Sequence, residues 1–177
     1  MTNQKNRKIL ILHGWQSNPA RQWFSNAKDR FEKDGYEVFV PKMPGGYFPK
    51  LKDWLKVVAD YHPDENWILI GHSLGGVTIL KYLEKNDQKI SQAILVATPF
   101  EPMKFNPIAN FFEDGFDFEK IKRNADKIDI VTVDEDPVVP LSHGQDWSKN
   151  LDAPLHTIRG FSHSYAIDLD LLEKLIS

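Results

Sequence analysis

Apolar residues along the chain follow two alternating patterns. Short, nearly continuous runs rich in Ile, Leu and Val indicate strands that are covered on both faces. Between these runs, apolar residues recur every three or four positions, which is typical of amphipathic helices. We expect strands at Ile9–His13, Glu37–Val40, Trp67–Ile70, Gln92–Ala97, Ile128–Val133 and Leu155–Ile158.

Residues that favour helix ends lie between the predicted strands. Asn18 followed by Pro19 predicts the start of the first helix, because proline suits the first helical position. Gly35 is placed to end that helix. Ser142 and Gln145 have the spacing of a capping box and predict the start of a later helix.

The alternation of strands and helices predicts parallel βαβ units with right-handed crossovers. The expected fold is α/β: an open, doubly wound, mostly parallel six-stranded sheet with helices on both faces. No repeat or change of composition divides the sequence, so we expect residues 1–177 to form a single domain without a large cap. Sheets of this kind bind ligands beyond the carboxyl ends of their strands.

A candidate nucleophile follows the third predicted strand. Residues 71–75 have the sequence G-H-S-L-G and lead directly into a helical pattern. This matches the G-x-S-x-G motif in its strand–turn–helix context, with Ser73 on the sharp turn. Two alternatives compete with this interpretation. A phosphate-binding loop would need lysine where Val77 stands, and a plain glycine turn would need no chemistry at all.

A serine hydroxyl becomes a good nucleophile only when a base takes its proton. His163 follows the last predicted strand, and an acidic run at 134–136 follows the strand before it, so both lie at the same sheet edge as Ser73. We favour Asp136 as the acid, because the loop must turn back over the sheet edge before a carboxylate can reach the histidine. Asp134 remains a competitor, since positions i and i+2 of a continuing strand share a face.

Two backbone N–H groups should stabilise the oxyanion that such a nucleophile creates. We expect one from Leu74, the residue after the nucleophile, and the other from Trp15, in the loop after the first strand. His156 lies within the last predicted strand and is expected to be structural.

The segment 98–127 is rich in phenylalanine. One interpretation is ordinary core packing. The other is a short flap that lines an apolar acyl pocket, because ligand sites often have aromatic walls. Trp23, Phe111 and Phe112 are the pocket candidates.

Composition excludes several classes of protein. The chain has no cysteine, which excludes disulfides, thiolate nucleophiles and cysteine-ligated metals. A net charge of -3 without a block of basic residues argues against a nucleic-acid partner. No apolar run approaches the ~20 residues of a membrane helix, and no secretory signal is visible. We therefore expect a cytoplasmic protein without membrane contact. No metal-binding spacing of histidines is present, so no metal or cofactor is expected.

Four segments together resemble the α/β-hydrolase superfamily. They are L-H-G-W at 12–15, G-H-S-L-G at 71–75, D-P-V-V-P at 136–140 and G-F-S-H at 160–163. More narrowly, the chain resembles the small, lidless serine hydrolases of the retinoblastoma-binding protein nine/YdeN-like family. The resemblance implies a triad of Ser73, His163 and Asp136. In this superfamily the acid tends to stand four residues before a proline, as Asp136 does before Pro140.

The expected function is a serine hydrolase that cleaves a carboxylic ester, thioester or small amide through an acyl-enzyme on Ser73. The substrate would be a small molecule or a short peptide. The alternative is a non-catalytic binding protein on the same fold. Contact with the retinoblastoma protein in this family rests on an L-x-C-x-E peptide, which this cysteine-free chain cannot contain.

Overall fold

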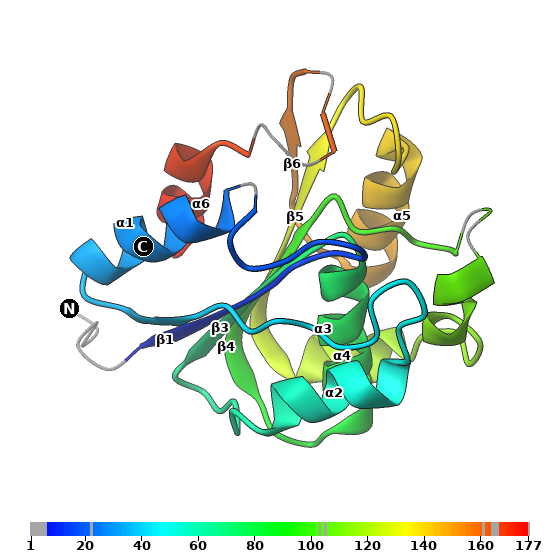
Figure 1. Cartoon of the computed structure of the whole chain (residues 1–177), viewed down its shortest axis with the longest axis horizontal. Helices are drawn as coiled ribbons and strands as arrows, with labels where there is room; N and C mark the ends of the chain where they lie inside the picture. The colour runs from blue at the N-terminus through cyan, green and yellow to red at the C-terminus, as the bar shows by residue number, and fades with distance from the viewer. Residues whose placement is uncertain are drawn as a thin grey trace.

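The structure is a computed structural model that describes residues 7–21, 23–102, 104, 106–160, 162–163 and 167–176. Six strands, all parallel, form one sheet in the order β2-β1-β3-β4-β5-β6 (Figure 1). This confirms the predicted α/β fold. The strands are β1 Lys8–Leu12, β2 Glu37–Phe39, β3 Trp67–His72, β4 Ile90–Val96, β5 Ala125–Val133 and β6 Leu155–Ile158.

Helices cover both faces of this sheet (Figure 1). One face carries α1 Phe24–Lys33 and α6 Leu169–Ile176. The other face carries α2 Leu51–Ala59, α3 Leu74–Lys85, α4 Phe118–Arg123 and α5 Leu141–Leu151, together with the 3-10 helix η2 Asn106–Phe111. In the described ranges, no helix is both long enough and apolar enough to span a membrane.

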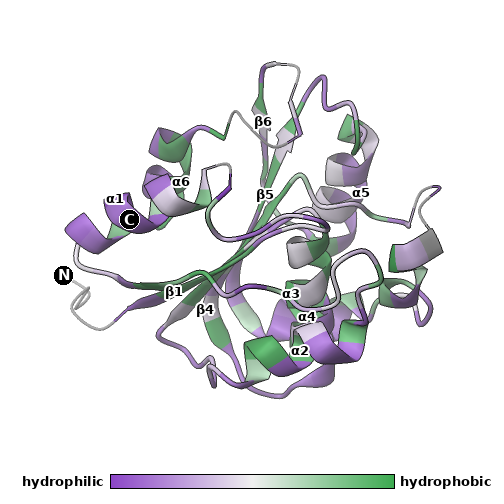
Figure 2. Cartoon of the chain, viewed as in Figure 1, coloured by the Kyte–Doolittle hydropathy of each residue, from purple (hydrophilic) through white to green (hydrophobic). Residues whose placement is uncertain are grey.

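The hydrophobic core forms two layers, one on each side of the sheet. Along β3, Ile68 and Ile70 belong to the layer under α1 and α6, whereas Leu69 belongs to the layer under the other helices. This alternation follows from the period of two in a strand. Figure 2 shows the contrast between the hydrophobic strand β1 and the largely hydrophilic helix α1, which buries only one side.

Two predicted helix starts are wrong. Helix α1 begins at Phe24, because the side chain of Asn18 accepts a hydrogen bond from the N–H of Ala20 and closes a local turn instead of capping a helix. Helix α5 begins at Leu141, with Pro140 at the N-cap position and no side-chain cap. Ser142 therefore lies inside the helix, where it cannot form the predicted capping box.

The phenylalanine-rich segment 98–127 packs onto the helical layer. Phe100, Phe116 and Phe118 surround Trp147 of α5, with ring centroids 4.6, 4.9 and 6.3 Å from it. Phe111 is fully buried. Core packing thus accounts for these four phenylalanines. Within the segment, 103 and 105 lie outside the described residues.

Candidate active site

Ser73 occupies a strained turn between β3 and α3. Its backbone has φ 53° and ψ -123°, a conformation that side-chain-bearing residues rarely adopt. The turn needs glycine on both sides of the serine. A Cβ atom on Gly71 would lie 2.5 Å from the Cα of Gly76, and one on Gly75 would overlap the carbonyl oxygen of Leu12. The sequence motif therefore forms the sharp turn that it predicts.

The structure brings Ser73, His163 and Asp136 together. Nε2 of His163 lies 3.1 Å from Oγ of Ser73, and Nδ1 lies 2.8 Å from Oδ2 of Asp136. A carboxylate can only accept, so Nδ1 carries the proton and Nε2 is left to accept the serine hydroxyl. The Asp136 side chain is fully buried. The arrangement can move a proton from the serine to the imidazole.

The two candidate acids have different contacts. Asp136 places Oδ2 at His163, and its Oδ1 accepts N–H bonds from Val138 at 2.8 Å and Val139 at 2.9 Å. Asp134 accepts the N–H of Gly160 at 2.8 Å instead. Asp136 is thus the carboxylate that faces the imidazole, and Asp134 holds the loop after β6.

The loop after β1 lies directly against the nucleophile. A Cβ atom on Gly14 would come within 2.9 Å of the Cβ of Ser73. His13 holds this loop, since its Nδ1 donates to the Gly14 carbonyl at 2.8 Å and its Nε2 accepts the N–H of Met43 at 3.0 Å. Burial lowers the pKa of His13, which keeps the ring neutral. Across from this loop, Leu74 supplies the first N–H of α3, at the positive end of the helix dipole.

Trp15, the other predicted oxyanion donor, directly follows Gly14. Its indole N–H donates to the carbonyl of Tyr47 at 3.1 Å, and the two rings lie 5.2 Å apart. The ring of Phe48 lies 5.0 Å from that of Tyr47. Tyr47 and Phe48 are 54% and 71% exposed. This aromatic rim, Trp15, Tyr47 and Phe48, borders the loop that touches Ser73.

The three pocket candidates from the sequence lie in different surroundings. Trp23 is buried beside Phe24, on the α1 side of the sheet. Phe111 is buried on the opposite side, where it contacts Trp54 edge-on at 5.4 Å. Phe112 is partly buried. The structure does not bring these three side chains into one site, and a role in substrate binding stays a prediction.

Two further histidines have structural contacts. Nε2 of His156 lies 3.0 Å from the buried carboxylate of Asp129, within the sheet, as expected of a structural residue. His72 was not predicted to belong to the site. Its Nε2 lies 2.7 Å from the backbone carbonyl of His163. The only signal in the sequence was a polar residue at the end of an apolar strand; its partner lies 91 positions away.

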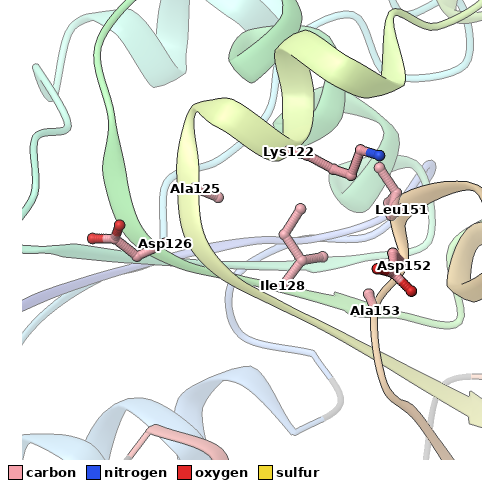
Figure 3. Close-up of a pocket in the computed structure, with 7 residues that line it drawn as sticks. All are labelled: Lys122, Ala125, Asp126, Ile128, Leu151, Asp152 and Ala153. Carbon is pink, nitrogen blue, oxygen red and sulfur yellow. The ribbon is translucent and has the colours of Figure 1, made fainter.

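A pocket, shown in Figure 3, lies far from Ser73, His163 and Asp136. It is bounded by the start of β5 and the end of α5, at the amino-end edge of the sheet. Its lining residues are Lys122, Ala125, Asp126, Ile128, Leu151, Asp152 and Ala153. Among the described residues, no group of three or more histidines and acids could hold a metal ion.

Comparisons with known proteins point to one family. The family described as serine hydrolase matches residues 9–168. The putative hydrolase YdeN of Bacillus subtilis is 29% identical over 162 residues, which cover 89% of this chain and 85% of YdeN. The serine hydrolase RBBP9 of Rattus norvegicus is 25% identical over 157 residues, or 87% of this chain and 80% of RBBP9.

The crystal structure of the ydeN gene product from B. subtilis superimposes with a TM-score of 0.88 at 28% identity. The match covers 96% of this chain and 98% of that one. Both the sequence and the fold therefore lead to one conclusion: the chain belongs to the serine hydrolase family, as a small α/β-hydrolase of the YdeN/RBBP9-like group.

Proposed function

We propose that the protein hydrolyses a carboxylic ester, thioester or small amide through an acyl-enzyme on Ser73. One observation carries the proposal: the His163 ring contacts both Ser73, at 3.1 Å, and Asp136, at 2.8 Å. These are hydrogen-bond distances at both ring nitrogens, as a nucleophile, a base and an orienting acid require.

In the proposed reaction, Nε2 of His163 takes the hydroxyl proton as Oγ of Ser73 attacks the carbonyl carbon. Asp136 holds the imidazole in the Nδ1–H form and stabilises its cation. The N–H groups of Leu74 and Trp15 would stabilise the negative charge on the carbonyl oxygen. His163 then protonates the leaving group, and the bond from the carbonyl carbon to that group breaks. Water, deprotonated by the same imidazole, releases the acid and restores the serine.

The exposed rings of the aromatic rim favour a substrate that carries an apolar group. Tyr47 and Phe48 expose ring surface beside the loop that touches Ser73. Burying such surface stabilises a complex by roughly 25 cal/mol per Å². We therefore propose a substrate whose acyl or leaving group is apolar enough to contact these rings.

Labelling with a fluorophosphonate probe tests the proposal. The probe reacts with an activated serine and needs no knowledge of the substrate. We expect one label per molecule on Ser73, and none on the Ser73→Ala variant, which removes the nucleophile. If folded wild-type protein takes up no label and hydrolyses no p-nitrophenyl ester, the alternative of a non-catalytic binding protein holds instead.

A further inference from the structure

His72 is a buried histidine beneath the proposed base. It ends β3, immediately before Ser73, and its side chain is only 1% exposed. Its ring centroid lies 4.9 Å from that of His163. The rings of Phe24 and Trp23 pack edge-on against the His72 ring, with centroid distances of 5.8 and 6.3 Å. The ring is therefore held between helix α1 and the loop that carries the base.

The hydrogen bond of His72 reaches the main chain of the base. Its Nε2 lies 2.7 Å from the carbonyl oxygen of His163. A carbonyl oxygen can only accept, so Nε2 carries the proton and Nδ1 has a bare lone pair. Asp136 fixes the side chain of His163 at Nδ1, and His72 fixes its backbone. The two contacts together restrain the ring that must reach Ser73.

The surroundings of Nδ1 of His72 indicate that the Nε2–H bond to His163 is the reason for a histidine at this position. In the described part of the chain, Nδ1 of His72 has no hydrogen-bond partner, although it is buried. An unsatisfied buried polar atom destabilises the folded state by about 1–3 kcal/mol. An apolar side chain would fill the same space without that loss. The feature that only the histidine supplies is the Nε2–H donor to His163.

The charge state of His72 also suits a position beside a base. Burial, and then the neighbouring His163, lower the pKa of His72 to about 3. The groups that act on its charge are His163, Asp136 and His13. His72 thus stays neutral while His163 becomes a cation during turnover, and it adds no repulsion to that cation.

We infer that His72 is a positioning residue for the proposed hydrolysis, which acts by donating its Nε2–H to the backbone carbonyl of His163. The inference rests on the proposed function and adds to it a fourth side chain. It also gives a reason for the buried position of Trp23, whose ring packs edge-on against that of His72.

A matched pair of variants isolates the hydrogen bond. Glutamine and methionine have nearly the same length and flexibility, but only glutamine carries a terminal N–H donor. In His72→Met we expect kcat for p-nitrophenyl acetate to fall by roughly 10–100-fold with KM little changed, because a base displaced by ~1 Å loses rate at that scale. In His72→Gln we expect most of kcat to be retained. Thermal unfolding of both variants identifies any general loss of stability.

A second measurement does not depend on activity. The proton between Nδ1 of His163 and Asp136 should give a downfield resonance in proton NMR of the free protein. We expect this resonance in wild type and His72→Gln, and its loss or broadening in His72→Met. Equal kcat in the two variants, or an unchanged resonance in folded His72→Met, would overturn the inference. Failure of the proposed function is distinct, because wild-type protein would then neither take up the fluorophosphonate nor hydrolyse esters.

Discussion

Asp134 and Asp136 stand two positions apart, yet their carboxylates serve different loops. Asp136 accepts two backbone N–H bonds at Oδ1, which leaves Oδ2 to face His163. These two N–H groups hold the carboxylate in its fully buried position. Asp134 accepts from Gly160. At the residue scale, backbone donors rather than sequence spacing decide which carboxylate meets the imidazole.

Changing each aspartate to asparagine tests this division. Asp136→Asn should lower kcat by about 10⁴, because an amide favours the wrong tautomer of the histidine. Asp134→Asn should keep most of the activity, since the asparagine oxygen can still accept the N–H of Gly160. Steady-state kinetics on one ester compares the two. A larger loss in Asp134→Asn would reverse the assignment, and small losses in both would remove the acid from the mechanism.

At the scale of elements, the segment between β2 and α2 is built to present side chains to solvent. Its backbone is anchored by indole N–H bonds from Trp15 to Tyr47 and from Trp54 to Pro44. The ring of Phe48 nevertheless remains 71% exposed. Phe111, on the 3-10 helix η2, is the opposite case, because it is fully buried.

Removing the ring of Phe111 or of Phe48 tests how much each ring contributes to stability. Phe111→Ala should lower the free energy of unfolding by about 3–5 kcal/mol, the usual effect of deleting a buried aromatic ring. Phe48→Ala, the exposed control, should change it by less than about 0.5 kcal/mol. Urea unfolding of the two variants measures both values. Similar losses in the pair would contradict the burial that separates them.

The aromatic rim should affect substrate preference. With p-nitrophenyl esters of increasing acyl length, we expect kcat/KM to rise in wild type, since a CH₂ group gains up to about 0.8 kcal/mol when fully buried. In Phe48→Ala the rise should be smaller, so that the acetate ester, which has the shortest acyl chain, loses the least activity. An identical chain-length profile in the variant would count against contact between the substrate and the rim.

Sequence patterns predicted the elements better than their ends. Apolar runs located all six strands, because a strand buried on both faces must be apolar. The predicted helix starts at Asn18 and Ser142 failed for different reasons. The Asn18 side chain closes a local turn, and α5 begins one residue before Ser142, with Pro140 at its N-cap position.

For the site, residues that follow strands were predictable. Ser73, His163 and Asp136 come together because parallel strands end at one edge. The contact of His72 with His163 was not predictable, since it depends on how the loop after β6 folds back over β3.

At the scale of the whole molecule, the buried histidines link stability to pH. The pKa of His72 falls from an ordinary 6.5 to about 3 in the fold. Between these values the unfolded chain binds a proton at this position and the folded protein does not. Acid therefore favours unfolding, and this contribution to stability is present above pH 6.5 and lost as the pH falls toward 3.

Comparison with His72→Gln tests this linkage. Between pH 6 and 4, the free energy of unfolding of wild type should fall more steeply than that of the variant, by up to ~1.4 kcal/mol per pH unit. Urea unfolding at several pH values gives both slopes. Parallel slopes would show that His72 is protonated equally in the folded and unfolded states. Glutamine is the suitable reference because it keeps a donor at the ring position without titrating.

The two outermost strands of the sheet are its shortest: β2 has three residues and β6 has four. Each sheet edge thus offers few unpaired backbone groups to another chain. On β2, the exposed Glu37 pairs with Lys8 of the neighbouring strand β1, which places charge on the strand beside which a further strand would have to dock. Short, charged edges are a natural protection against edge-to-edge aggregation. Short edge strands thus disfavour extension of this open sheet into a neighbouring molecule at high concentration.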